Sequence, residues 1–288
     1  LWEDCTMMKN NSMSNVMLAD YYKLKKLKSV WIGLIVMFLL LLLGYCAYWV
    51  GIKVVESRPV NPADPEADII KDQTIAYLNT IRKTMLYGST STVRIELFVA
   101  IIACIFIGKD FSCGATAIYT ARGTKRAQTY FSKLFSLITI FVAYACIMLI
   151  FSGIFSSFDG RLGAFGKVEF AMLMRNFFLQ LLCGIASISI FTMIAFLTRS
   201  SGAALATNIG IYVVLGIIIS LITMITSIDG SEKANTWAYF LPLQQMTIAS
   251  TVGKLTKAQK VAVTVMPIVY TVISTLIGYF TFEKRDIK

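Results

Sequence analysis

Histidine is absent from this chain of 288 residues, and charged residues make up only 15% of it. Without histidine there can be no histidine base, histidine metal ligand or Ser-His dyad. An ordinary soluble domain contains roughly 25% charged residues. The low charge, together with 57% hydrophobic residues and a mean hydropathy of +0.70, excludes a soluble globular enzyme and a disordered chain. We therefore expect an all-α integral membrane protein.

Nucleotide and metal motifs are missing as well. The six cysteines include no C-x-x-C pair, so neither a zinc site nor a disulfide framework is expected. No G-x-x-x-x-G-K-[ST] phosphate loop is present: Gly108-Lys109 and Gly123-Thr124-Lys125 lack its partner glycine. The sequence thus predicts no catalytic residue, no metal and no cofactor in this chain.

Acidic residues are outnumbered, with 16 Asp and Glu against 27 Lys and Arg, which gives a net charge of +11. In a membrane protein this excess is typical of basic cytoplasmic loops facing anionic lipid. No nucleic-acid-binding pattern accompanies it, so the lipid bilayer rather than a nucleic acid is the expected partner.

Six apolar runs are long enough to cross a bilayer of about 30 Å at 1.5 Å per residue. The first begins near Val30 and is too long for a cleavable signal peptide, so none is expected. The six predicted spans are Val30–Val50, Val93–Gly108, Tyr130–Phe151, Asn176–Leu197, Ala203–Ile225 and Val261–Phe282.

Basic residues near the span ends predict that both termini are cytoplasmic. Four lysines between residues 23 and 28 precede span one, and further basic residues lie between spans two and three and after span six. The predicted organisation is a cytoplasmic N-terminus (1–29), a six-span domain (30–282) and a tail (283–288). Within that domain, loops 51–92 and 226–260 are outer, and loop 109–129 is cytoplasmic.

Two segments outside the spans have helical periodicity. In Ser12–Lys28 an apolar face opposite the lysines predicts an amphipathic helix at the membrane interface. In the first outer loop, Pro59, Pro62 and Pro65 predict irregular chain, and Asp72–Tyr87 then predicts a short helix lying on the outer surface. The apolar face of the N-terminal helix consists of Met13, Met17, Tyr21, Leu24 and Leu27.

The segment Gly108–Leu134 is too polar to enter lipid and too patterned for a random loop. Asp110 is placed to serve as the N-cap or a first-turn acid of a helix through Ala115 and Ile118. Gly123 is a natural stop for that helix. A short helix across the cytoplasmic mouth has a shape suited to being pushed by another protein.

Here the sequence resembles the membrane subunits of ABC-2 type ABC transporters. The family pattern has an acidic residue, a Gly-Thr pair, a short coupling helix, a basic turn and a lysine opening the third span. Asp110, Gly114, Arg126 and Lys133 fit this pattern, with Gly114-Ala115-Thr116 in place of Gly-Thr. Short helical pieces before the last span also agree, here within Trp237–Ser250, and so does the ending Phe282–Asp286.

The resemblance implies a permease subunit and not an enzyme. A separate cytoplasmic ABC ATPase would bind ATP and magnesium, and a second permease copy or paralogue would complete the transporter. The implied activity is export, with an amphipathic, bacteriocin-like peptide or a hydrophobic drug as substrate. The implied ATPase-coupling residues are Asp110, Gly114, Thr116, Arg122, Lys125 and Arg126.

Polar residues at membrane depth are candidates for a substrate path. Arg94 and Glu96 are two residues apart, so on one helix they would not face each other. The ordinary alternatives, which the sequence favours, are that Glu96 and Arg175 extend to the membrane interface and that Gln180 and Asn208 hydrogen-bond between helices. The predicted substrate-path set is Glu96, Arg175, Gln180 and Asn208.

The alternative is a six-span protein that works alone, as a secondary transporter, a sensor or a membrane enzyme. An enzyme would need polar catalytic groups at membrane depth, and a proton-coupled carrier would need buried carboxylates, for which Glu96 is the candidate. The expected location is a bacterial plasma membrane, because many isoleucines and lysines with only 5 prolines favour a low-GC bacterium.

Overall fold

Every element in the described part of the chain is an α-helix. The computed structural model describes residues 13–57, 65–121, 123–157, 167–229, 237–251, 253 and 255–284, and the side chains of these residues other than 65–68, 92, 167–169 and 226–229. The helices are α1 (Met13–Lys26), α2 (Lys28–Glu56), α3 (Pro65–Tyr87), α4 (Ser89–Val93), α5 (Ile95–Ser112), α6 (Ala115–Ala121), α7 (Arg126–Ser157), α8 (Lys167–Thr198), α9 (Ser201–Asp229), α11 (Pro242–Ala249) and α12 (Lys257–Lys284).

Five helices are long and apolar enough to cross a membrane: α2, α7, α8, α9 and α12. They contain five of the six predicted spans, and their composition is that of a membrane protein. The remaining predicted span, Val93–Gly108, falls on α5, which has 18 residues and carries Glu96, Lys109 and Asp110. With these charges α5 meets the length and hydropathy requirements only together with α6, from which it is bent by 63°.

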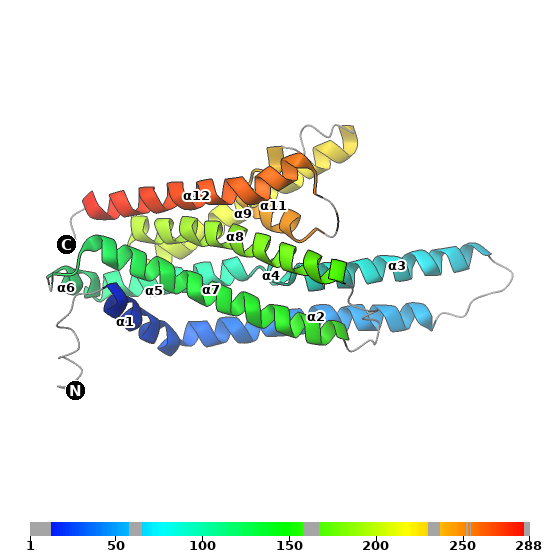
Figure 1. The fold of residues 1–288 in the computed structure, drawn as a ribbon, viewed down its shortest axis with the longest axis horizontal. Coiled ribbons are helices and arrows are strands. Elements are labelled where there is room, and N and C mark those ends of the chain that lie inside the picture. Colours follow the sequence, from blue (N-terminus) through cyan, green and yellow to red (C-terminus); the bar gives the residue numbers. More distant parts are fainter. Residues whose placement is uncertain are drawn as a thin grey trace.

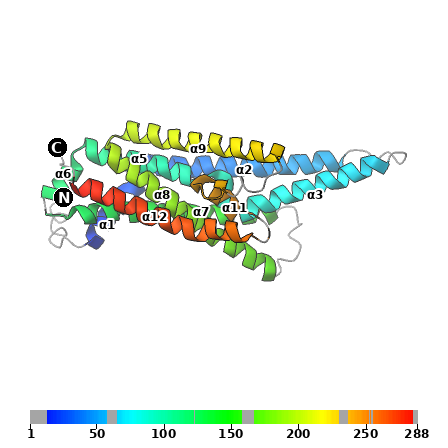
Figure 2. The same ribbon diagram turned by 90° about the horizontal axis from the view of Figure 1, so that it is seen from above.

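Helix α8 is the centre of the bundle: 61% of the residues in its 18-residue apolar stretch are buried. It packs most extensively on α12 and also contacts α5, α7, α9 and α11. Helix α9 lies at the periphery (Figure 2), and only 6% of the residues in its 18-residue apolar stretch are buried. The exposed isoleucines, valines and leucines of α9 are suited to contact lipid, which is as apolar as they are.

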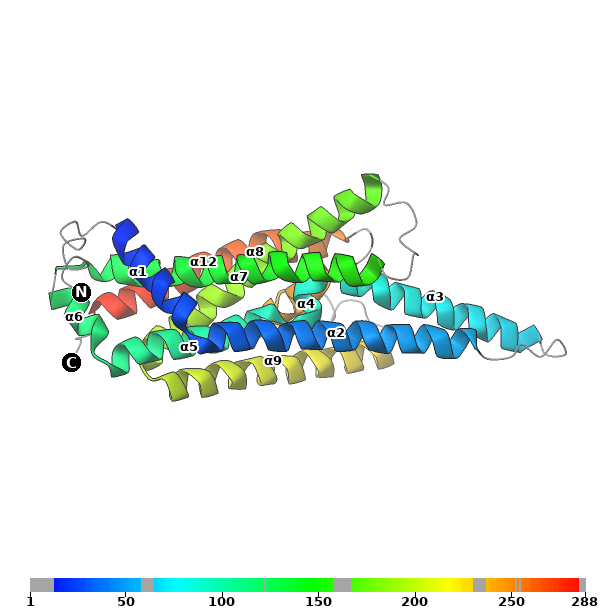
Figure 3. The ribbon, with the colours of Figure 1, turned by 90° about the horizontal axis from the view of Figure 1, so that it is seen from below.

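Helices α2 and α3 form a hairpin that projects beyond the other helices (Figures 1 and 3). The 29 residues of α2 extend about 44 Å, which exceeds the hydrocarbon core of a bilayer. Gly44 and Gly51 allow the close approach, since a Cβ atom there would lie 3.3 Å from Met85 and 3.4 Å from Leu78. The predicted Asp72–Tyr87 helix therefore exists, but it packs along α2 and is longer than predicted.

Pro65 marks the start of the longer helix α3. It was expected to belong to irregular chain, yet it is the first residue of α3. Proline suits the first position of a helix, where its missing N–H would have no partner and its φ is already helical. Pro59 and Pro62 lie outside the described residues.

Helix α1 covers the segment predicted to be amphipathic, and most of the predicted apolar face is at least partly buried. Asp20 and Leu24 are buried against the bundle, where α1 packs on α7, whereas Tyr21 is 46% exposed. The exposed side carries Leu18 and Tyr22 beside lysines, and the Lys26 ammonium lies 4.3 Å from the centre of the Tyr22 ring. An apolar patch edged by lysines still has the composition of an interfacial helix.

Two glycines give a direct test of this packing. A Cβ atom on Gly108 would lie 2.5 Å from the Cα and backbone N of Ser201, so α5 and α9 could not keep their contact. We expect Gly108→Ala to lower the free energy of unfolding by about 1–3 kcal/mol. Gly210→Ala on α9 meets nothing within 4 Å and should raise it by about 0.5–1 kcal/mol. Unfolding in detergent measures both variants, and equal stabilities would contradict the helix contact.

Candidate functional site: the α5–α6–α7 corner

Gly114 forms the sharp corner between α5 and α6. Its φ of 65° lies in the left-handed region, which costs a residue with a side chain about 1–2 kcal/mol but is accessible to glycine. The backbone N–H of Cys113 donates to the Lys109 carbonyl at 2.9 Å and closes α5. The Gly114 carbonyl accepts from the N–H of Ile118 at 3.1 Å and begins α6. Gly114 therefore has a structural reason to be glycine.

Gly123 ends α6 as the sequence predicted. Its φ is 85°, and its N–H donates to the Thr120 carbonyl at 3.0 Å. The N–H of Thr124 donates to the Tyr119 carbonyl at 3.1 Å. These two bonds form the Schellman motif that commonly stops a helix at glycine. The short helix α6 is thus bounded by two left-handed glycines; Arg122, a predicted coupling residue, lies outside the described residues.

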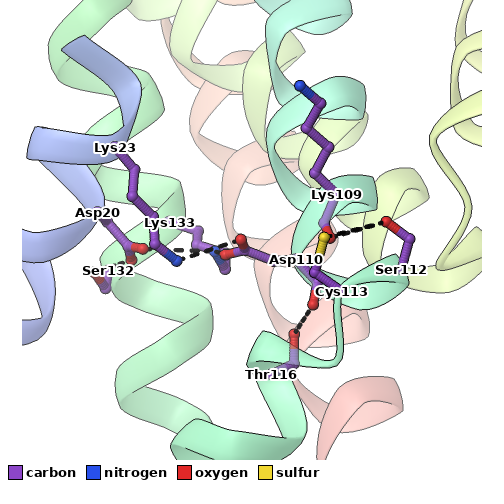
Figure 4. Close-up of polar contacts among 9 residues, drawn as sticks. All are labelled: Asp20, Lys23, Lys109, Asp110, Ser112, Cys113, Thr116, Ser132 and Lys133. Atoms are coloured by element: carbon purple, nitrogen blue, oxygen red, sulfur yellow. Dashed lines mark hydrogen bonds and ion pairs between the residues drawn. The ribbon is translucent and has the colours of Figure 1, made fainter. Parts of the chain in front are cut away.

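A buried ion-pair cluster lies behind this corner (Figure 4). The corner cluster consists of Asp20 and Lys23 on α1, Asp110 on α5, and Ser132 and Lys133 on α7. Lys133 forms an ion pair with the Asp110 carboxylate, and its Nζ lies 3.5 Å from Asp20 Oδ1. The Ser132 hydroxyl donates to Asp20 Oδ2 at 2.6 Å, and Lys23 Nζ lies 3.3 Å from Asp110 Oδ1. One cluster therefore joins three helices.

Lys133 is the centre of the corner cluster because its side chain is only 1% exposed. An ammonium so fully buried from solvent requires negatively charged partners. Asp110 and Asp20 provide it from two other helices, and the Phe106 ring lies 4.2 Å from the Lys133 Nζ on another side. Removing one partner from such a group leaves a buried charge uncompensated, which is more costly than never having had the pair.

Lys23 closes the cluster toward solvent. Burial lowers the pKa of its ammonium, but a hydrogen bond with the Tyr119 side chain and the charges of Asp110 and Asp20 outweigh burial, so the pKa is raised. Lys23 Nζ also lies 4.9 Å from the centre of the Tyr119 ring on α6. Helix α1 thus contacts both α5 and α6 through one charged side chain.

The structure corrects the role predicted for Asp110. It is not the N-cap of α6 but a last-turn residue of α5, and its carboxylate faces α7 and α1. Thr116 is buried and donates its hydroxyl to the backbone carbonyl of Asp110 at 3.4 Å. The carboxylate is therefore occupied by two lysines and is not free to cap α6.

Sequence reasoning missed Asp20. It is the only acidic residue between Asp4 and Glu56, and it lies in a segment rich in lysine. A lone acid on the buried face of a basic helix indicates a buried cationic partner, although it does not say which cation.

The two remaining coupling candidates lie at the start of α7. The backbone N–H of Lys125 donates to Gln128 Oε1 at 3.2 Å, a capping-box contact at the start of α7. Arg126 Nη1 donates to the Glu283 carbonyl at 2.6 Å, which joins the start of α7 to the end of α12. Lys125 is exposed beside α6, and Ile118 on α6 is 51% exposed. The corner therefore presents an apolar side chain and a cation on its outer surface.

Two of the predicted substrate-path residues, Gln180 and Arg175, hold helices and loops together. Gln180 Nε2 donates to the Tyr87 carbonyl at 2.6 Å, while its Oε1 accepts from the Thr90 hydroxyl. Arg175 Nη2 donates to the Gly253 carbonyl at 3.1 Å and to Asn176 Oδ1 at 2.9 Å. Both are committed to structural hydrogen bonds.

Glu96 and Asn208, in contrast, line hollows between α5, α8 and α9. One small pocket includes Glu96, and an adjoining one includes Asn208; Phe191 and Tyr212 border both. Asn208 Nδ2 also donates to Cys104 Sγ at 3.0 Å across α5 and α9. The four predicted residues do not form one site.

Arg94 and Glu96 do meet, although their spacing predicted that they would not. Arg94 is not helical: its φ of 52° makes a left-handed break between α4 and α5. Its Nη1 therefore reaches to 3.7 Å from Glu96 Oε1. The prediction assumed one continuous helix through Val93, and that assumption was wrong.

The described residues contain no group of three or more His, Cys, Asp or Glu that could hold a metal ion. The fold and the corner define an all-helical membrane protein with a charged joint at one end of its bundle. Comparison with family models places the chain in a family: residues 69–288 match "Protein of unknown function (DUF2705)", and the chain belongs to that family. No curated protein matches it.

The corner cluster predicts a large cost for losing Lys133. We expect Lys133→Met to lower the free energy of unfolding by about 3–5 kcal/mol, because Asp20 would lose its ion-pair partner while buried and Asp110 would keep only the partly exposed Lys23. The double variant Lys133→Met, Asp110→Asn should recover part of that loss. Lys125→Met, which removes an exposed lysine, should stay within about 0.5 kcal/mol of the parent. Unfolding in mixed micelles measures all three variants. If Lys133→Met left the free energy of unfolding unchanged, the cluster would not stabilise the fold.

Proposed function

We propose that this chain is the permease subunit of an ABC-2 type exporter in a bacterial plasma membrane. It would cross the bilayer six times, with α5 as the second span and α6 as a cytoplasmic coupling helix. The observation that carries the proposal is the corner, where the short helix α6 lies between two left-handed glycines. The end of α5 that leads into α6 is joined to α1 and α7 through Lys133. The resemblance of Asp110, Gly114, Arg126 and Lys133 to the family pattern supports the same reading.

The arrangement of the ends supports a common cytoplasmic side. The start of α1, helix α6 and the end of α12 all lie at one end of the bundle (Figure 1). The bond from Arg126 to the Glu283 carbonyl joins two of these elements directly. Lys23, Lys25 and Lys26 occupy the last turn of α1 at this end. Concentrated lysine there agrees with the rule that cytoplasmic ends are basic.

The corner offers a physical route from a partner to the spans. A force on α6 would act through the Gly114 turn on α5 and through the Asp110–Lys133 pair on α7. Because Asp20 binds the same lysine, α1 would move with them. Tightly packed helices shift as units and do not deform continuously. Movement of a seven-residue helix would thus be passed to three longer ones.

The partners follow from this role. A cytoplasmic ABC ATPase would bind ATP and magnesium, since this chain has no phosphate loop. A second permease copy or paralogue would complete the path. The substrate would be an amphipathic peptide or a hydrophobic drug, in keeping with the apolar spans. Short helix α11, before the last span, would lie on the outer side.

A stand-alone secondary transporter or sensor is the second candidate, and Glu96 is the observation that favours it. Its side chain is 2% exposed and lines a pocket. Buried carboxylates at membrane depth are typical of ion-coupled carriers. Such a protein would need no ATPase, so the two candidates differ in whether α6 binds a partner.

Ile118 provides the test. We expect Ile118→Asp to reduce the ATPase that co-purifies with the tagged chain about tenfold or more, because a charge would replace an exposed apolar contact on α6. Ile70→Asp on the projecting end of α3 is the matched control, since Ile70 is 60% exposed, and it should leave the ATPase bound. Quantitative mass spectrometry of the purified material measures both.

Two results would count against the proposal. If the parent chain purifies folded but without any phosphate-loop ATPase, the secondary transporter or sensor becomes the better candidate. If the ATPase is present and Ile118→Asp retains it fully, α6 is not the contact surface.

A further inference from the structure

The pocket at Glu96 contains polar atoms that the fold leaves unmatched. The Glu96 pocket lies between α5, α8 and α9 beside the start of α11, and its lining includes Glu96, Phe191, Ile211, Tyr212, Leu215 and Leu243. Glu96 is 1% exposed, and neither of its carboxylate oxygens accepts a hydrogen bond from a described residue. The Tyr212 hydroxyl lies close enough to interact with the Glu96 carboxylate, but no hydrogen bond of good geometry joins it to a described residue.

Arg94 balances the Glu96 charge only in part. The guanidinium Nη1 lies 3.7 Å from Glu96 Oε1, which is an ion-pair distance and not a hydrogen bond. Its nitrogens point instead to the Leu243 carbonyl at 3.5 Å and the Thr247 hydroxyl at 3.4 Å. The Arg94 side chain is 37% exposed, so much of its charge is turned to the surroundings. A buried carboxylate in this state is costly until a cation or donor reaches it.

We propose that the Glu96 pocket binds a hydrophobic cation, namely a primary ammonium on a compact apolar body. An ammonium carries three N–H donors and no acceptor. The two Glu96 oxygens and the Tyr212 oxygen supply the acceptors it needs. The walls formed by Leu215 and Leu243 suit the apolar body, and the rings of Phe191 and Tyr212 add aromatic surface that attracts cations.

The position of the pocket agrees with a ligand arriving from lipid. Helix α9 forms one wall of the pocket, and only 6% of the residues in its 18-residue apolar stretch are buried. Ile211, on that wall, is 37% exposed. A hydrophobic amine dissolved in the bilayer would therefore be separated from Glu96 by a single helix. As a substrate class for a transporter this ligand rests on the proposed function, but the binding site does not.

The probe is tritiated 1-aminoadamantane, a primary ammonium on a rigid hydrocarbon cage. The full chain is placed in lipid nanodiscs without any ATPase, and binding is measured by scintillation proximity. We expect saturable binding that unlabelled 1-aminoadamantane displaces. The neutral isostere 1-adamantanol should compete about tenfold or more less well, because it has no positive charge to pair with the Glu96 carboxylate and only one hydrogen-bond donor.

Variants separate the site from the lipid background. We expect Glu96→Gln to weaken binding about tenfold or more, whereas Asp72→Asn, which neutralises an exposed carboxylate on α3, should leave it unchanged. Ile211→Trp, on the exposed side of α9, should also weaken binding by narrowing the pocket while leaving Glu96 intact. This second variant keeps the test valid if Glu96→Gln does not fold.

The outcomes divide cleanly. Binding that 1-adamantanol displaces equally well, or that survives both Glu96→Gln and Ile211→Trp, overturns the cation site. Cation binding by a chain that never co-purifies with an ATPase leaves the pocket in place and rejects only the exporter. Loss of the ATPase in Ile118→Asp with cation binding retained supports both, since the two surfaces are separate.

Discussion

A single buried ammonium, that of Lys133, sets the arrangement of one whole end of this protein. At 1% exposure it requires negative charge, and the two carboxylates beside it come from different helices, Asp20 on α1 and Asp110 on α5. Helices α1, α5 and α7 must therefore meet at this point for the charge to be balanced. The Gly114 and Gly123 turns then fix where α6 begins and ends. The corner is a consequence of one charge and two glycines.

Helix α5 connects the two polar features of the fold. Glu96 lies in its first turn and Asp110 in its last, fourteen positions apart, which corresponds to about 21 Å along the axis. One end of α5 borders the Glu96 pocket, and the other is held by Lys133 and turns into α6. A rigid helix with a pocket at one end and a charged joint at the other is suited to relate occupancy of the pocket to the position of α6. The left-handed breaks at Arg94 and Gly114 mark the limits of this rigid unit.

The sequence predicted those parts of the fold that depend on local pattern. Apolar runs of bilayer length predicted α2, α7, α8, α9 and α12, and glycine after a polar helix predicted the end of α6 at Gly123. It did not predict contacts between distant residues: Asp20 and Lys133 are 113 positions apart, and no periodicity records their pairing. It also failed where the backbone leaves the helical region, because periodicity assumes a continuous helix. The break at Arg94 is such a place, and it brings Arg94 to Glu96 against the expected spacing.

The most direct measurement is to learn what α6 touches in the native membrane. A photo-crosslinking amino acid at position 118, on the exposed side of α6, would be activated in intact cells, and its adduct identified by mass spectrometry. An exporter subunit should crosslink at this position to a protein with a phosphate loop, and a crosslinker at exposed position 70 on α3 should not. Adducts at position 118 with lipid alone, or with no ATPase, would contradict a coupling role for α6.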